Sequence, residues 1–505
     1  MLIISGAVII YYSTTCAWAV YYTIYSCRTV LPWTSCANTW NTEYCVENMK
    51  LITTRSSTVL KETQVNKTMA FTTKFAGNSS ENGTLFHTAA EEFWLYKVLS
   101  ITSGLEHLGG IKWELAICHL VTWILIFSSL AKGIKSIGKV VYVTATMPYV
   151  FLFILLVRGV TLPGGPQGLL VFIIPDFNKL LDVQVWVTAC GQVFFSLGPG
   201  YGGLISMASY NTFHSNCLRN AIICTLACGG SSLFAGLVVF AFLGSMAHEA
   251  NVPITDVLSS GPGLGFIIYP EAVAQLPVPQ IWSVLFFAML ILLVQDSLFS
   301  TVETVISAIL DEYPFLLRWR IPVTAAYCLV SFLLGLIFTT EGGMYVHQLV
   351  DWYIASIFLI SAGFLECITF GWVYGVNRIS ADVALMIGRP APLFFRIAWS
   401  SITPAMLLSI FIFTLVRYRP PTYGNYIYPD YAASLGWCLA VVPCIPLVTV
   451  MWVIIYKEEG SVLQRMKKSL KPDRSWGPGK SSCRDVYCRV YRAHYIRNSR
   501  EKTML

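Results

Sequence analysis

The chain has 505 residues, of which 55% are hydrophobic and only 12% are charged, and its formal net charge is +7. Soluble domains carry about 25% charged residues, so this composition excludes a soluble protein. The basic residues lie in short segments between apolar runs and in the C-terminal tail, and the net charge therefore does not indicate nucleic-acid binding. The sequence has no Walker loop, zinc-ligand spacing or nucleophile elbow, and we expect no enzyme.

A helix needs about 20 apolar residues to cross a bilayer, and about ten segments meet this requirement. In chain order they are 1–26, 113–131, 139–159, 184–211, 219–248, 278–312, 321–340, 345–374, 392–417 and 432–456. The sequence thus predicts an all-α polytopic membrane protein. It divides into a first span (1–28), a long loop (29–92), the remaining transmembrane bundle (93–456) and a basic tail (457–505).

The loop 29–92 has the features of an extracellular segment. It contains three N-glycosylation sequons, at Asn66, Asn78 and Asn82. Cys36 and Cys45 lie in the same loop and could form a disulfide there, because the extracellular compartment is oxidising. We therefore expect a glycosylated, disulfide-containing loop outside the cell.

The tail 457–505 carries thirteen Lys and Arg residues against five Asp and Glu residues. Basic segments beside spans mark the cytoplasmic side, and an even number of spans places both termini there. A specific lipid-binding role for the tail is the alternative, and the topological signal is the simpler interpretation.

The stretch "FFSLGPGYGG" (194–203) interrupts the apolar run 184–211. Inside a helix, glycine and proline cost about 1 and 3 kcal/mol relative to alanine. Secondary transporters break helices at the bilayer midplane, where exposed carbonyl oxygens bind sodium and exposed N–H groups bind carboxylates. A simple proline kink is the alternative. It fits less well because five glycines and prolines fall within six residues, flanked by Ser196 and Ser206.

Ionisable residues inside spans are functional candidates because they are costly there. Asp296 and Ser297 are adjacent, with Leu293 one turn earlier, and their oxygens are hard ligands suited to a small cation. A buried carboxylate hydrogen-bonded between helices explains Asp296 equally well. Structural pairing is the favoured role of Glu303, whereas both roles stay open for Glu366.

Four motifs occur in order along the chain: "LPWTSCANTWN" (31–41), "GKVVYVTATMPY" (138–149), "SLGPGYGGLISMASYN" (196–211) and "QDSLFSTVETVISAILDEYP" (295–314). With these motifs the chain closely resembles the neurotransmitter:sodium symporter family, which comprises sodium- and chloride-dependent transporters of monoamines, GABA, glycine, proline and related amino acids. The resemblance implies a twelve-span fold of two inverted five-helix repeats that works by alternating access. Segment 1–26 resembles the family's third span, so we expect the chain to correspond to spans 3–12 and to lack the first two. We also expect residues 1–505 alone not to transport by the usual mechanism.

The resemblance also implies the ions and the residues that bind them. Sodium and chloride would be co-transported, with no organic cofactor. The implied sodium ligands are Ser196, the Leu293 carbonyl, Asp296 and Ser297. The implied chloride ligands are Gln192, Ser196 and Ser232. Cys228 stands where the family has an asparagine that serves the first sodium site, and a neutral thiol is a poor ligand for a hard cation.

For the substrate and the gates, the resemblance implies a second set of residues. Tyr12 would meet the substrate carboxylate, and the other implied substrate residues are Phe195, Gly200 and Tyr201. Asp351 resembles an outer-gate acid and Asp311 an inner-gate acid.

The stretches "SGPGLGFIIYPEAVAQLP" and "VETV" look more like the glycine and proline branch than the monoamine branch. The resemblance therefore predicts a plasma-membrane symporter of a small amino acid or neurotransmitter. The alternative is a transport-inactive paralogue or isoform that assembles with a partner, which Cys228 favours. The last residues, Thr503-Met504-Leu505, have the form of a PDZ ligand, and assembly with copies or relatives is a further possibility.

Overall fold

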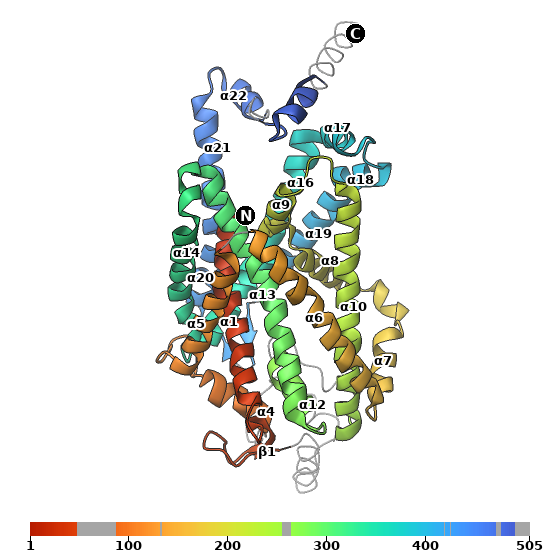
Figure 1. Ribbon diagram of the computed structural model, residues 1–505, viewed down its shortest axis with the longest axis vertical. Helices are drawn as coiled ribbons and strands as arrows, with labels where there is room; N and C mark the ends of the chain where they lie inside the picture. The colour runs from red at the N-terminus through yellow and green to blue at the C-terminus, as the bar shows by residue number, and fades with distance from the viewer. Residues whose placement is uncertain are drawn as a thin grey trace.

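The computed structural model describes residues 1–47, 87–131, 134–254, 264–418, 420–424, 426–470 and 476–489. Most helices run along the long axis of a single bundle, as Figure 1 shows. The segments β1 and α4 lie at one end of this bundle, and α22 lies at the other. The three predicted glycosylation sites and Thr503-Met504-Leu505 fall outside the described residues.

The first half of the chain contains long helices joined by short 3₁₀ or π segments, labelled η. Its elements are α1 (Leu2–Ser26), η1 (Pro32–Thr34), β1 (Cys45–Val46), β2 (His87–Thr88), α4 (Ala89–Glu92), η2 (Phe93–Leu99), α5 (Trp113–Leu130), α6 (Ile134–Thr161), α7 (Gly165–Ile173), η3 (Phe177–Leu181), α8 (Val183–Leu197), η4 (Pro199–Tyr201), α9 (Gly203–Ser209) and α10 (Cys217–Ala250).

The second half of the chain also consists mainly of helices joined by short 3₁₀ or π segments. Its elements are η5 (Leu264–Ile268), α12 (Tyr269–Ala274), α13 (Pro279–Glu312), η6 (Pro314–Trp319), α14 (Arg320–Gly335), η7 (Leu336–Thr339), α15 (Gly343–Asp351), η8 (Trp352–Phe358), α16 (Leu359–Ile368), η9 (Thr369–Gly375), α17 (Val376–Ile387), α18 (Leu393–Ile397), η10 (Ala398–Ile402), α19 (Thr403–Val416), β3 (Thr422–Tyr423), β4 (Tyr426–Ile427), α20 (Asp430–Val441), η11 (Val442–Cys444), α21 (Ile445–Lys457) and α22 (Val462–Ser469).

The predicted spans agree with the helices. Within the described ranges, nine helices are long and apolar enough to cross a membrane, and they cover nine of the ten predicted segments. The one remaining predicted segment, 184–211, forms α8 and α9. These helices have 15 and 7 residues, and each is too short to span the membrane alone. The polytopic helical fold is therefore confirmed, and the exception is the segment in which the sequence predicts a break.

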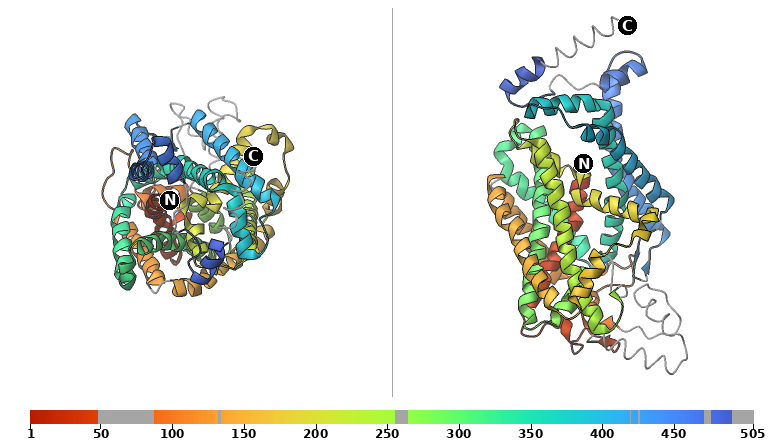
Figure 2. Two further views of the ribbon diagram at one scale, coloured as in Figure 1. Left: turned by 90° about the horizontal axis from the view of Figure 1, so that it is seen from above. Right: turned by 90° about the vertical axis from the view of Figure 1, so that its right-hand side faces the viewer.

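Helix α1 lies towards the inside of the bundle, where it packs against α13, α5 and α14 (Figure 2). Its aromatic side chains Trp18 and Tyr22 are fully buried. Trp18 meets Trp94 edge to face with ring centroids 5.1 Å apart, and Tyr22 packs against Phe287 at 4.6 Å. This aromatic core fixes α1 beside α13, and these two helices carry Tyr12 and Asp296.

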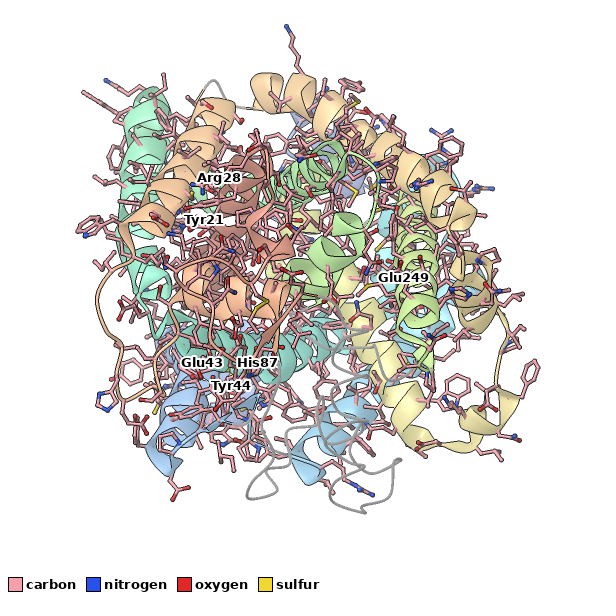
Figure 3. The ribbon with its side chains drawn as sticks, turned by 90° about the horizontal axis from the view of Figure 1, so that it is seen from below. Tyr21, Arg28, Glu43, Tyr44, His87 and Glu249 are labelled. Atoms are coloured by element: carbon pink, nitrogen blue, oxygen red, sulfur yellow. A yellow bond between two sulfur atoms is a disulfide. The ribbon has the colours of Figure 1, made fainter. Side chains whose placement is uncertain are left out.

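The segment that follows α1 is folded onto the end of the bundle. Cys36 and Cys45 form a disulfide, with Cα atoms 5.8 Å apart. β1 pairs in parallel with β2, and the His87 N–H donates to the Tyr44 carbonyl at 3.3 Å. Figure 3 shows His87 and Tyr44 next to each other in the view from this end. The loop is thus closed both covalently and by backbone pairing.

Candidate ion and substrate site

The break between α8 and α9 is built from backbone conformations that only glycine adopts at little cost. Gly198 has a φ of +58° and Gly202 a φ of +77°, both in the left-handed region. Between them, Pro199–Tyr201 forms one 3₁₀ turn, closed by the Gly202 N–H on the Pro199 carbonyl at 3.2 Å. The sequence prediction of a helix interrupted here, and not only kinked, agrees with this geometry.

The broken segment is clamped between neighbouring helices. Gly200 is buried and faces Leu359 and Ala362 of α16. The Ser5 hydroxyl of α1 donates to the Tyr201 carbonyl at 2.5 Å, and α9 packs against α13. The break therefore lies inside protein, which is the condition under which a membrane tolerates irregular backbone.

Tyrosines surround the break on the side of α1. The Tyr12 hydroxyl interacts with Ser297 of α13, and the Tyr11 hydroxyl interacts with Asp351 of α15. The Tyr201 hydroxyl lies near the Asp351 carboxylate and the Tyr12 hydroxyl, close enough for electrostatic interaction. Its hydroxyl is buried and has no hydrogen-bond partner within the described residues. A buried hydroxyl without a partner is costly, so a polar ligand group beside Tyr201 would stabilise this arrangement.

The aromatic ring of Phe195 completes this surface. Its centroid is 6.5 Å from that of Tyr201, in an edge-to-face arrangement. The structure therefore groups Tyr12, Tyr201 and Phe195, three of the four predicted substrate residues, near the break. The fourth, Gly200, faces α16.

Asp296 lies on α13, half-buried, and accepts a hydrogen bond from the Thr144 hydroxyl of α6 at 2.5 Å. Ser297 is exposed, and its hydroxyl donates to the Leu293 carbonyl at 3.4 Å. None of the ion pairs found among the described residues involves Asp296. The Asp296 carboxylate thus has one hydroxyl partner and no cationic partner within the described residues, and the Ser297 hydroxyl and Leu293 carbonyl contact each other on the same helix.

The predicted first sodium and chloride site contains a soft ligand. The Ser196 hydroxyl of α8 lies 3.0 Å from the Cys228 sulfur of α10. Ser232 is one turn further on, and its hydroxyl bonds to the Cys228 carbonyl at 3.1 Å. Gln192, Ser196 and Ser232 are exposed. The structure therefore joins Ser196 and Ser232 through Cys228, whereas no hydrogen bond within the described residues links Gln192 to this group.

The gate candidates have different surroundings. Asp351 is paired with Tyr11, whereas Asp311 is exposed at the end of α13 and belongs to none of the ion pairs in the described ranges. Glu303 is fully buried and takes two hydrogen bonds from Arg320, at 2.6 and 2.7 Å. Structural pairing, the role that the sequence favours for Glu303, thus has a named partner.

Several partners were not identified from the sequence. Thr144 belongs to the quoted motif 138–149, but nothing in the motif connects it to Asp296. Tyr11, beside the predicted Tyr12, contacts the predicted gate acid. A polar side chain inside an apolar span is the one signal that could have drawn attention to Thr144.

A membrane bundle with one helix broken beside intramembrane carboxylates has the architecture of secondary transporters. The model of the sodium:neurotransmitter symporter family matches residues 1–458, and the chain belongs to this family. The predicted family is therefore confirmed.

Curated relatives agree with this membership. The chain is 40% identical to the sodium- and chloride-dependent glycine transporter 2 of Xenopus laevis over 95% of its own length, and spans 61% of that protein. It is 40% identical to the sodium- and chloride-dependent glycine transporter 1 of Xenopus laevis, over 95% of the chain and 75% of the relative. It is 42% identical to the sodium- and chloride-dependent taurine transporter of Bos taurus, over 92% of the chain and 72% of the relative.

Proposed function

We propose that these residues serve sodium- and chloride-dependent symport of a small amino acid. The observation that carries the proposal is the helix break at Gly198–Gly202 beside α13, which bears the half-buried Asp296. Broken helices supply carbonyl oxygens and N–H groups to ions and substrate at the bilayer midplane. Asp296, Ser297 and the Leu293 carbonyl are the oxygens that we propose for sodium.

The substrate that we propose is a small zwitterion or amino sulfonic acid, of the glycine or taurine kind. Tyr12 and Tyr201 carry hydroxyls that can donate to its acidic group, and Phe195 offers an apolar wall. The names of the similar glycine and taurine transporters support this substrate class. We propose the plasma membrane as its location, with both termini cytoplasmic. Assembly with family members and capture of Thr503-Met504-Leu505 by a PDZ domain are further proposals.

One observation favours a second candidate, namely substrate or partner binding without transport. The Ser196 hydroxyl faces the Cys228 sulfur, and thiol sulfur is a poor ligand for sodium. The predicted ion ligands Gln192, Ser196 and Ser232 are also exposed in residues 1–505. A soft thiol in place of a hard ligand weakens the first sodium site, so we expect no coupled uptake by residues 1–505 on their own.

The test separates binding from transport. Residues 1–505 in lipid nanodiscs are exposed to radiolabelled glycine, taurine and proline, with sodium replaced by N-methylglucamine or chloride by gluconate. We expect saturable binding that requires sodium and weakens at least tenfold in Tyr12→Phe, whereas Tyr142→Phe, at an exposed position of α6, leaves it unchanged. Absence of sodium-dependent binding of all three compounds would contradict the proposal.

The same compounds are then offered to cells that display residues 1–505 at their surface. We expect no sodium-dependent uptake above that of untransfected cells. Robust coupled uptake would show that these residues transport on their own and would remove the second candidate.

A further inference from the structure

Helix α22 has one apolar face that nothing in the described protein covers. At 100° per residue, Val462, Leu463, Met466 and Leu470 fall within an arc of about 100°. Their side chains are exposed by 69%, 71%, 44% and 56% respectively. An isolated helix with four exposed apolar residues on one side requires a partner surface.

The opposite face of α22 is basic. Arg465, Lys467 and Lys468 lie on the flank and far side of the apolar arc, and none of them forms an ion pair within the described ranges. Arg465 donates to the Gly460 carbonyl at 2.7 Å, and Lys468 donates to the Glu459 carbonyl at 2.8 Å. Both side chains therefore contact backbone groups, and their charges are not neutralised.

The N-terminal end of α22 is capped by residues of the same segment. Ser461 and Gln464 form a capping box, in which the Gln464 side chain accepts from the Ser461 N–H at 3.2 Å. Such a cap stabilises the first turn without help from tertiary packing. The start of α22 is therefore stabilised by its own sequence, whereas a helix of only 8 residues needs a further surface to stay folded.

The position of α22 fixes which surface lies within its reach. The last membrane-length helix ends at Lys457, and four residues separate it from α22. Four extended residues reach about 14 Å, so the start of α22 stays within about 14 Å of the end of this span. Figures 1 and 2 show α22 next to the end of α21, at the end of the bundle opposite to β1.

We propose that α22 lies in the membrane interface and binds anionic phospholipid of the phosphatidylserine kind. Val462, Leu463, Met466 and Leu470 insert at the boundary between headgroups and acyl chains, and Arg465, Lys467 and Lys468 bind the acidic headgroups. This arrangement is that of an interfacial amphipathic helix, which joins a buried apolar face to a basic one. This role differs from that of a topological signal, because it requires lipids that carry a negative charge.

The test uses residues 1–505 in nanodiscs of phosphatidylcholine alone or with 30% phosphatidylserine. A genetically encoded solvatochromic amino acid replaces Met466 on the apolar face or, as the control, Gln464 on the other side, and the Met466 variant also carries Gln464→Ala so that both variants lack the cap. We expect the emission at position 466 to shift to the blue with phosphatidylserine, and the emission at position 464 to stay that of a water-exposed group.

Charge is tested in the same protein. Each basic residue near an anionic surface contributes about a fivefold factor to binding, so Lys467→Gln with Lys468→Gln should lower the inserted-to-free ratio about 25-fold. Arg389→Gln, at an exposed position in another loop, should leave this ratio unchanged. Two results would overturn the proposal. One is equal water exposure at positions 464 and 466 with phosphatidylserine. The other is a blue-shifted position 466 that is independent of lipid charge, which would mean packing against protein.

Discussion

Two intramembrane carboxylates on α13 differ in how well their oxygens are satisfied. Glu303 takes two hydrogen bonds from Arg320 and one from Ser307, at 2.6, 2.7 and 3.0 Å. Asp296 takes one, from Thr144. An ionised carboxylate away from water is stable only when it is paired or binds a cation. Glu303 is therefore structural, and Asp296 is the carboxylate that we propose for sodium.

Thr144 orients the Asp296 carboxylate, so its removal should weaken sodium binding. An interhelical hydrogen bond in a membrane is worth about 1 kcal/mol, and Thr144→Val should therefore lower sodium affinity about fivefold. Thr146→Val, whose hydroxyl contacts only backbone of its own helix, should change the affinity less than about twofold. Equal losses in the two variants, measured by binding of radioactive sodium, would exclude this role.

At the level of elements, Glu92 fastens the disulfide loop to the bundle. Glu92 is fully buried at the end of α4 and accepts from Asn41 Nδ2 at 3.0 Å and from the Thr42 N–H at 2.9 Å. The Thr42 hydroxyl donates to its other oxygen. Three donors, from Asn41 and Thr42, thus converge on one carboxylate. These two residues lie four and three positions before Cys45 in the chain.

Glu92→Ala should free this loop. Hydrogen bonds to a charged group are worth about 1.5–3 kcal/mol each, so the loss should exceed about 3 kcal/mol of local stability. We expect the Cys36–Cys45 disulfide to be reduced at least tenfold faster by dithiothreitol. Glu43→Ala is the matched control, because Glu43 is exposed in the same loop and belongs to none of the ion pairs in the described ranges. Equal reduction rates in the two variants would contradict this account.

The β1–β2 pairing next to it should depend on pH. The hydrogen bond that the His87 ring donates to the Glu91 carboxylate raises the pKa of His87 above its usual 6.5, although burial opposes this. A raised pKa in the folded state means that the stabilisation is complete below pH 6.5 and is lost as pH rises through the raised value. Amides 87–92 should therefore exchange more slowly at pH 6 than at pH 8, after correction for intrinsic rates. Glu91→Gln should abolish the difference, and slower exchange at pH 8 would refute the prediction.

At the scale of the whole molecule, the spans and the break could be predicted from the sequence, because both are local. The length of the apolar segments defines the nine spans, and the glycines Gly198 and Gly202 indicate the break. The partners could not be predicted, because they join distant parts of the chain. Thr144 and Asp296 are 152 residues apart, and Ser5 and Tyr201 are 196 apart. From the sequence, Arg320 has the features of a basic loop residue, whereas in the structure it forms an ion pair with Glu303.

The grouping of site residues follows from the packing of a few long helices. α1 lies beside α13, and the break is clamped by α1, α16 and α13, so Tyr12, Tyr201 and Asp296 come from three separate segments. The side chains of the predicted chloride set instead remain exposed. Ser297 and Leu293 are exposed as well, but Asp296 is half-buried and holds an interhelical hydrogen bond, so our central claim is the proposed sodium site at Asp296.

Binding of radioactive sodium to residues 1–505 in nanodiscs tests this claim most directly. We predict saturable binding that falls at least tenfold in Asp296→Asn. Glu312→Gln, which changes an exposed carboxylate on the same helix, should leave binding within about twofold of the unmodified chain. Sodium binding that is unchanged in Asp296→Asn, or that is absent from the unmodified chain, would contradict the account.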